Sequence, residues 1–311
     1  MFWGGLVFTS GWVMRCISSY FPGNLEVFIA QTVLILAGPP IYSAAEYNIL
    51  GRLMHYLPMH APLNPNRLVY VFIYLGAIVE ALTAAGSVRI GNAQDDKTMM
   101  RSGAVLVVIS VILQAIVECV FMVMVGLVHY RCARAKMLTS QVRTICIMLY
   151  GTSGLILLRC ICRAIEKFSV LSVITSESCD STCNSVLRNE WFLYAFEAAP
   201  MVIYTYWLNV VHPGRFLPTK PQVYLGFDKI ERTGPGWIDK RSQWETFMDP
   251  FDFAGMTKGQ PAHERFWLQQ SEWPPFDRNG NGDSNIQSSK TIGHESRSLL
   301  PSRNDLKDRS V

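Results

Sequence analysis

The chain has 311 residues, of which 50% are apolar and 17% are charged, with a net charge of +4 and a mean hydropathy of +0.18. Soluble domains average about a quarter charged residues, so this composition is unusually apolar. The charges are also unevenly spread, because residues 1–212 carry 14 of the 28 basic and 11 of the 24 acidic residues. We therefore expect a membrane domain over residues 1–212 and a water-exposed tail over residues 213–311.

The sequence also argues against several classes of protein. Nucleic-acid binding needs clustered basic residues, and no basic cluster of that kind occurs here. The sequence contains no GxxxxGK[ST] motif of an ATP-driven pump, no HExxH motif and no GxSxG motif. The eight cysteines lack paired CxxC spacing, so no metal site and no cofactor is predicted. An enzyme is not expected, because no nucleophile–base set is visible.

Five apolar stretches approach the roughly 20 residues that a helix needs to cross a bilayer. A sixth, at the N-terminus, is shorter and contains Arg15. A secretory signal is the alternative there, although no basic region precedes the apolar stretch. The sequence thus predicts an all-α, polytopic transmembrane bundle of about six spans, with a largely disordered C-terminal tail. The expected spans are residues 1–17, 29–50, 68–90, 104–130, 145–162 and 191–211.

The connections between these spans predict their orientation, because cytoplasmic loops carry an excess of Lys and Arg. Residues 131–143 contain four basic and no acidic residues, and the preceding basic loop contains Arg52 and Arg67. We expect both loops and the tail to lie in the cytoplasm. The loop between the last two spans then lies outside, where its Cys179 and Cys183 either form a disulfide or remain unrelated thiols.

Ionisable residues inside the spans are the best functional indicators, because each costs about 3 kcal/mol at mid-membrane. Glu80, Glu118 and Glu197 lie near the middle of their spans, and Glu46 follows an expected break at Pro39–Pro40. One interpretation is structural, with polar residues lining helix contacts and acids paired to arginines. The other is a shared polar groove that binds a substrate. The predicted groove residues are Glu80, Gln114, Glu118, Arg159, Arg163, Tyr194 and Glu197.

Three longer motifs stand out: PPIYSAAEYNILGR at 39–52, LYGTSGLILLRCICRAIEKF at 149–168, and NEWFLYAFEAAPM at 189–201 with NVVHPG at 209–214. They resemble the fungal lipid-translocating exporter family, the RTA-type seven-helix membrane proteins. The resemblance covers nearly all of residues 4–213. Besides Arg159, Arg163, Tyr194 and Glu197, the matching positions are Pro39, Tyr47, Arg52, Tyr150, Ser153, Glu166, Glu190, Trp191, Asn209, His212 and Pro213.

The chain also departs from the family pattern. Residues 1–17 correspond to the family's second helix, so we expect the first helix to be missing. Phe8 stands where that second helix usually has an acid. Glu80 and Glu118 stand where apolar residues are usual. The polar residues are therefore rearranged relative to the family.

The resemblance implies a membrane translocator or exporter of amphiphiles, such as sphingoid bases, phospholipids or sterol-like toxicants, contributing to lipid asymmetry, stress response and drug resistance. A polar or ammonium head group would slide along the groove glutamates, while Arg159 and Arg163 supply counter-charge or hold a phosphate. The alternative is a seven-helix-type sensor whose tail signals to a cytosolic partner. The plasma membrane is the expected location, with the vacuolar or endoplasmic reticulum membrane as alternatives.

The tail contains two further features. Residues 277–283 resemble the start of an EF-hand loop, but Ser288 stands at the position of the final glutamate, so we expect a solvated turn. Four tryptophans are unusual for a disordered segment, and we expect them to dock at the membrane interface or to bind a partner. They are Trp237, Trp244, Trp267 and Trp273.

Overall fold

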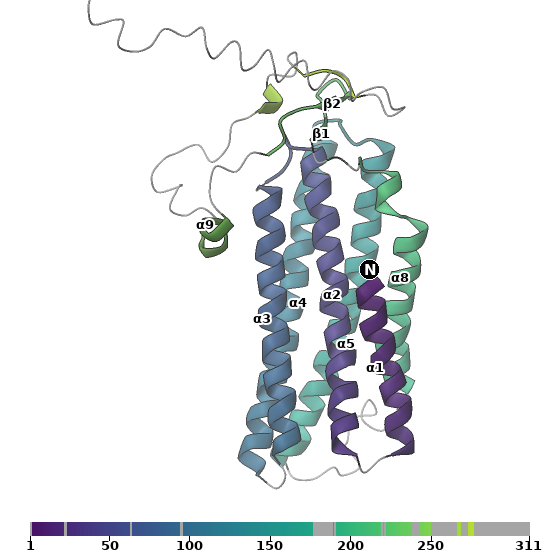
Figure 1. Ribbon diagram of the computed structural model, residues 1–311, viewed down its shortest axis with the longest axis vertical. Helices are drawn as coiled ribbons and strands as arrows, with labels where there is room; N and C mark the ends of the chain where they lie inside the picture. The colour runs from purple at the N-terminus through teal and green to yellow at the C-terminus, as the bar shows by residue number, and fades with distance from the viewer. Residues whose placement is uncertain are drawn as a thin grey trace, which may run out of the picture.

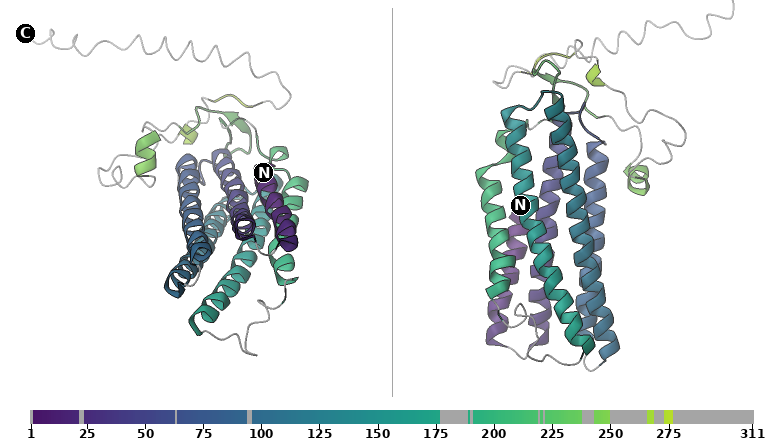
Figure 2. Two further views of the ribbon diagram at one scale, coloured as in Figure 1. Left: turned by 60° about the horizontal axis from the view of Figure 1, so that its bottom comes forward. Right: turned by 180° about the vertical axis from the view of Figure 1, so that it is seen from behind.

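Long helices packed side by side make up most of the molecule (Figures 1 and 2). The computed structural model describes residues 2–21, 24–62, 64–93, 96–176, 189, 191–218, 220, 222–237, 243–249, 266–268 and 273–276. The long helices are α1 (Phe2–Tyr20), α2 (Leu25–Tyr56), α3 (Pro65–Asn92), α4 (Lys97–Arg134) and α5 (Ser140–Ser176). A last helical rod is built from α7 (Trp191–Leu193), the π-helical segment η1 (Tyr194–Ala198) and α8 (Ala199–Val210). The predicted all-α polytopic bundle is confirmed.

The helices begin where side chains satisfy their first backbone N–H groups. The side chain of Asn24 accepts from the backbone N–H of Glu26 at 3.1 Å, and Asp96 accepts from that of Thr98 at 2.9 Å. Asn64 caps α3 in the same way, directly before Pro65. These caps lie in the connections between helices, so α2, α3 and α4 each begin several residues before their predicted apolar stretches.

Prolines act differently in two helices. The prolines Pro39 and Pro40 lie inside α2, a 32-residue helix that continues through both of them. The expected break is therefore wrong. Packed neighbouring helices stabilise α2 against the lost backbone hydrogen bonds, as in other membrane helices. Near Pro200 the helix is altered, because the π-helical segment η1 ends at Ala198, two residues before the proline. Proline lacks an N–H and collides with the preceding turn, which favours such a bulge.

Four helices in the described part of the chain are long and apolar enough to cross a membrane, namely α2 from Glu26, α3, α4 and α5 to Thr175. The α1 helix and the rod formed by α7, η1 and α8 lie alongside them in the same bundle (Figure 1). Many large apolar side chains point outward, among them Val123, Val202 and Tyr206. A soluble monomer rarely exposes so much apolar surface, so the exterior of this bundle suits lipid.

Successive helices pack against each other, and the tightest core lies among α2, α4, α5 and α8. Tyr47 stacks on Phe72 with ring centroids 4.6 Å apart, and both rings contact Phe121. Gly86 on α3 and Gly103 on α4 lie where these two helices approach each other closely. A Cβ atom added to either glycine would lie 2.8 Å from the carbonyl oxygen of the other.

The chain after the bundle folds back onto one end of it. Strands β1 (Val223–Leu225) and β2 (Glu231–Thr233) form an antiparallel pair, which Figure 1 shows above α2. Arg52 donates to the carbonyl of Pro218 at 3.0 Å, and the Tyr56 hydroxyl donates to Glu231 at 2.9 Å. Leu217 and Leu225 join the hydrophobic core. The connections α2–α3 and α4–α5 lie at this same end, as the predicted orientation requires.

Three of the tail tryptophans contact Phe266. Trp237 and Trp267 pack against each other and against Phe266 of the short helix η3 (Phe266–Leu268). Trp273 donates to the Phe266 carbonyl at 3.3 Å. Trp244, in α9 (Gln243–Met248), is strongly exposed. The Phe266 ring also packs against Tyr224 of β1, so this aromatic cluster stabilises the hairpin.

The segment 277–283, which resembles the start of an EF-hand loop, lies outside the described residues.

The close approach of α3 and α4 predicts an unequal effect of two glycine substitutions. Gly86→Ala should lower the free energy of unfolding by about 1–3 kcal/mol, because its new methyl group has no room. Gly76→Ala, on the same helix with open space around it, should be neutral or stabilising. Denaturant unfolding in detergent measures both; equal losses would contradict this packing.

The docked hairpin predicts where the tail can be removed. Deleting residues 277–311 should leave the melting temperature in detergent unchanged. Deleting residues 213–311 should lower it, because the core loses Leu217 and Leu225 and Arg52 loses its backbone partners. If both truncations melt like the full chain, the hairpin does not stabilise the bundle.

Candidate functional site

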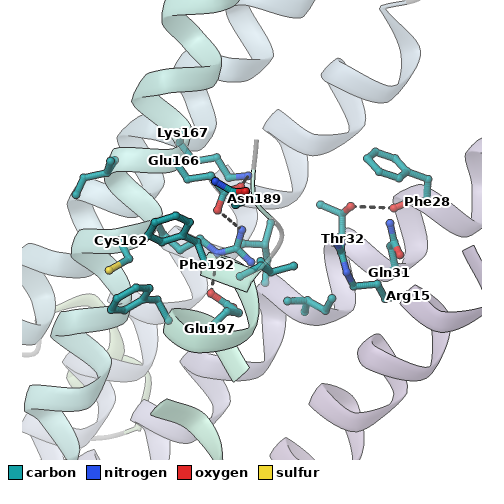
Figure 3. A pocket seen from close by; sticks show the side chains of 16 residues that line it. Arg15, Phe28, Gln31, Thr32, Cys162, Glu166, Lys167, Asn189, Phe192 and Glu197 are labelled. Atoms are coloured by element: carbon teal, nitrogen blue, oxygen red, sulfur yellow. Dashed lines mark hydrogen bonds and ion pairs between the residues drawn. The ribbon is translucent and has the colours of Figure 1, made fainter. Parts of the chain in front are cut away.

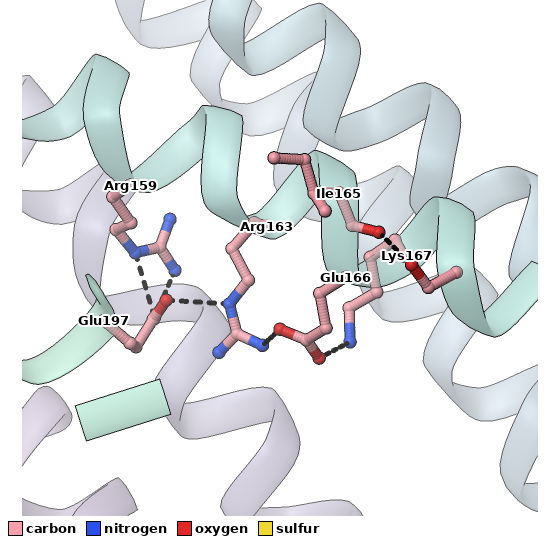
Figure 4. Close-up of polar contacts among 7 residues, drawn as sticks. Arg159, Arg163, Ile165, Glu166, Lys167 and Glu197 are labelled. Carbon is pink, nitrogen blue, oxygen red and sulfur yellow. Dashed lines mark hydrogen bonds and ion pairs between the residues drawn. The ribbon is translucent and has the colours of Figure 1, made fainter. Parts of the chain in front are cut away.

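Five charged side chains form one continuous network inside the bundle (Figure 4). Glu197 accepts from the Nε of Arg159 at 2.9 Å through Oε1, and from the Nε of Arg163 at 2.7 Å through Oε2. Arg163 also donates to Glu166 at 2.7 Å, and Lys167 donates to the other oxygen of Glu166 at 2.9 Å. The network is therefore built almost entirely from charge-assisted hydrogen bonds.

Two elements bring the network together. Arg159, Arg163 and Glu166 lie on one face of α5, because residues three and four apart are neighbours on a helix. Glu197 comes from η1, the π-helical segment before Pro200. Arg159 and Glu197 are each only 2% exposed. Charges buried this deeply are costly unless paired, so Glu197 is the residue that makes the burial of both arginines possible.

A cavity of about 510 Å³ lies beside the network, between α1, α2, α5 and the segment around α7 and η1 (Figure 3). One part of its lining is polar and comprises Arg15, Gln31, Thr32, Arg163, Glu166, Lys167, Asn189 and Glu197. The other part is apolar and comprises Phe28, Ile35, Leu36, Phe192, Leu193 and Phe196. A cavity with both kinds of lining suits a ligand that has a polar head and an apolar body.

Gln31 lines the cavity, although it is not among the predicted groove residues. It lies on α2 and is 4% exposed, yet its Oε1 atom has no hydrogen-bond partner among the described residues. A buried polar atom without a partner costs free energy unless a ligand or water satisfies it. The sequence feature that could have identified it is its position as a lone glutamine within an apolar span.

A second polar cluster lies apart from this cavity and combines Glu46 of α2 with Glu118 of α4. The Ser153 hydroxyl of α5 donates to Glu46 at 2.9 Å, and Glu118 interacts with both Ser153 and Glu46. Both carboxyl groups are buried, and one oxygen of each has no partner in the described part of the chain. Glu46 is not among the predicted groove residues, although it lies inside a predicted span.

The structure separates the predicted groove residues. Glu197 and Arg163 line the cavity with Arg159 directly behind them, whereas Glu80 and Glu118 are not among its lining residues. Glu80 is half-buried on α3. Gln114, on α4, is partly buried, and its amide nitrogen has no partner among the described residues. Tyr194, on η1, is half-exposed, with its ring 5.4 Å from that of Trp12.

Several positions of the family motifs have structural contacts. Tyr150 pairs with His129 at 3.4 Å. The His212 ring accepts from the Gly214 N–H at 3.1 Å, where Pro213 starts the short helix η2 (Pro213–Arg215). Asn209 donates to the Thr205 carbonyl, and Trp191 stacks on Phe192. The locations of the other described motif residues are given above; these are Pro39, Tyr47, Arg52, Ser153 and Glu166.

Three predicted residues, Glu190, Cys179 and Cys183, lie outside the described residues. Within the described residues, no group of three or more His, Cys, Asp or Glu side chains could hold a metal ion.

The network predicts that two buried glutamates differ in their effect on stability. Glu197→Gln should lower the free energy of unfolding by about 3–5 kcal/mol, because it leaves two buried arginines without their shared counter-ion. Glu118→Gln should cost much less, because this carboxylate forms no ion pair in the described part of the chain.

Denaturant unfolding in detergent measures both variants, and Glu197→Asp is the charge-preserving control. Equal losses for the two Gln variants would show that the ion pairs do not stabilise the bundle.

Comparison with known proteins identifies the family. Residues 1–220 match the model described as RTA1 like protein. A lipid-translocating exporter-like protein RTA1 from Leptosphaeria maculans is 37% identical over 74% of this chain and 46% of its own length, so the chain spans about half of that relative. A protein of the same name from Ajellomyces capsulatus is 26% identical over 81% of this chain and 80% of its own. Protoporphyrin uptake protein 1 of Saccharomyces cerevisiae is 27% identical over 65% and 64%. No solved structure matches. The resemblance is confirmed, and the chain belongs to the RTA1-like family of membrane proteins.

Proposed function

We propose that this protein moves amphiphilic lipids across the membrane and binds the polar head group in the cavity beside the Arg163–Glu197 network. The observation that carries the proposal is the mixed lining of that cavity, which places paired charges opposite aromatic and aliphatic side chains inside a membrane bundle. The apolar tail of the substrate would remain against the lipid-facing helices.

The physical task of such a translocator is to replace the hydration of the head group. A polar group that enters hydrocarbon without hydrogen bonds costs several kcal/mol, and a charge costs more. Arg163, Lys167 and Gln31 present polar atoms inside the bundle, where they can replace part of the hydration of a head group. The charged network is already held by internal bonds, so it needs little rearrangement when a head group arrives.

The names of the relatives support a membrane translocator of amphiphiles without specifying which lipid this chain moves. Two are named as lipid-translocating exporter-like proteins, and another is named for protoporphyrin uptake. Lipid or amphiphile substrates, a role in lipid asymmetry or toxicant resistance, and location in the plasma membrane are therefore parts of our proposal. The cavity contains only one of the three predicted groove glutamates, so we restrict the head-group site to the surroundings of Glu197.

A matched pair of cysteine substitutions tests the proposal. Cys162 lines the cavity, whereas Cys119 is exposed on α4. Cys162→Trp should fill part of the cavity and slow transfer at least tenfold, whereas Cys119→Trp should transfer lipid at the rate of the unmodified chain. The measurement uses the purified full chain in liposomes with fluorescent lipids in one leaflet, and follows their appearance in the other leaflet.

Folding of each variant is checked by its melting temperature and its elution as a single species. Transfer by a folded Cys162→Trp variant at the full rate would remove the cavity from the path. Absence of transfer by the folded, unmodified chain would reject the translocator and favour the sensor alternative. The chain without residues 277–311 should keep its transfer activity, whereas a sensor that signals through this segment would lose its output.

A further inference from the structure

The cavity beside Arg163 has an unequal supply of hydrogen-bond donors and acceptors. Both oxygens of Glu197 accept from arginine nitrogens, and Oε1 accepts twice. Both oxygens of Glu166 are also engaged, one by Arg163 and one by Lys167. The carboxylates that line the cavity are therefore already neutralised by cations of the protein itself.

The donors are engaged to a smaller extent. Arg163 has five N–H bonds, of which one at Nε and one at Nη1 bind acceptors among the described residues. Lys167 has three N–H bonds, and within the same part of the chain one of them binds an acceptor, Glu166. Both residues line the cavity, so their remaining donors are available to a ligand there. Together with Arg159, the network contains three cations and two carboxylates, which leaves an excess positive charge.

Gln31 provides an independent sign that a ligand binds here. Its buried side chain lines the cavity from α2, on the other side from the α5 cations (Figure 3). Its Oε1 has no partner among the described residues, so it can accept a hydrogen bond from a hydroxyl group of a ligand. The cavity thus offers the cationic donors of α5 at one wall and, at the other, the neutral acceptor of Gln31 near Arg15.

We propose that this cavity selects amphiphiles with an anionic oxygen-rich head group, a phosphate monoester above all, over amphiphiles with an ammonium head group. The inference rests on the proposed function and names its substrate class. A phosphate offers several acceptor oxygens and fits the free donors of Arg163 and Lys167. An ammonium group needs acceptors, finds the carboxylates occupied and is repelled by the excess positive charge.

Binding to the purified full chain in neutral detergent tests the proposal. The probes are hexadecyl phosphate, palmitate and hexadecylamine, with inorganic phosphate as the probe without an apolar chain. Calorimetry should show hexadecyl phosphate binding at least tenfold more tightly than hexadecylamine. Palmitate should fall between them, because a carboxylate has fewer acceptor oxygens. Inorganic phosphate should bind much more weakly than hexadecyl phosphate, because it makes no contact with the apolar lining.

Variants separate the role of the cavity from general charge attraction. Lys167→Gln should weaken hexadecyl phosphate binding at least tenfold, and Lys167→Arg should largely preserve it. Lys136→Gln, on the exposed loop at the other end of the bundle, should have no effect. Gln31→Leu should weaken the binding of a phosphate amphiphile that carries a hydroxyl near its head, a lysophosphatidic acid, more than that of hexadecyl phosphate.

Each outcome has one meaning. Equal or tighter binding of hexadecylamine overturns the proposed selectivity, and if the amine is also the faster substrate in liposomes, the translocator stands with a different substrate class. Binding of inorganic phosphate as tight as that of hexadecyl phosphate shows an ion site rather than an amphiphile site. Equal weakening by Lys136→Gln assigns the effect to net charge. If neither amphiphile binds and neither is transferred by folded protein, both proposals fall.

Discussion

Glu197 accepts hydrogen bonds from Arg159 and Arg163 deep inside a bundle whose exterior is apolar, and the rest of the functional architecture depends on this contact. Two guanidinium groups cannot be dehydrated side by side without a counter-ion. The contact therefore couples the position of η1 to that of α5. Because Glu166 and Lys167 continue the same network, it also places the polar lining of the cavity.

The π-helical segment gives this contact its geometry. A regular helix through residues 191–210 would point Glu197 in a different direction from the one it has in η1, since a wider turn rotates the following side chains. Pro200 favours the irregularity from within the sequence. The aromatic side chains of the same segment, Phe192 and Phe196, complete the apolar lining, so one local irregularity contributes to both kinds of lining.

The opposite end of the bundle is held by different forces. Arg52 and Tyr56 extend from the end of α2 and hold the segment after α8 through hydrogen bonds, while Leu217 and Leu225 enter the core. The aromatic cluster around Phe266 then stabilises the hairpin. Packing and hydrogen bonds hold this end, with one ion pair between Arg232 and Asp228 in the hairpin. The charged cavity lies elsewhere, between the beginning of α2 and the C-terminal part of α5.

The sequence by itself determined the class of the protein, the number and approximate position of the helices, and the residues of highest electrostatic cost. Hydropathy predicts spans because the bilayer requires about 20 apolar residues whatever the fold. Spacing also placed Arg159 and Arg163 on one face of α5, because helical periodicity is a local property.

Only the tertiary structure decided which polar residues meet. In the sequence, each of Glu80, Glu118 and Glu197 is an acid near the middle of an apolar span. In the structure, Glu197 accepts from two arginines, whereas Glu118 interacts with Glu46. Gln31 becomes a cavity-lining residue only because α1, α5 and η1 close around it. These outcomes depend on the rotation and depth of each helix in the bundle. The packing of one helix against another sets both, and no single stretch of sequence contains that information.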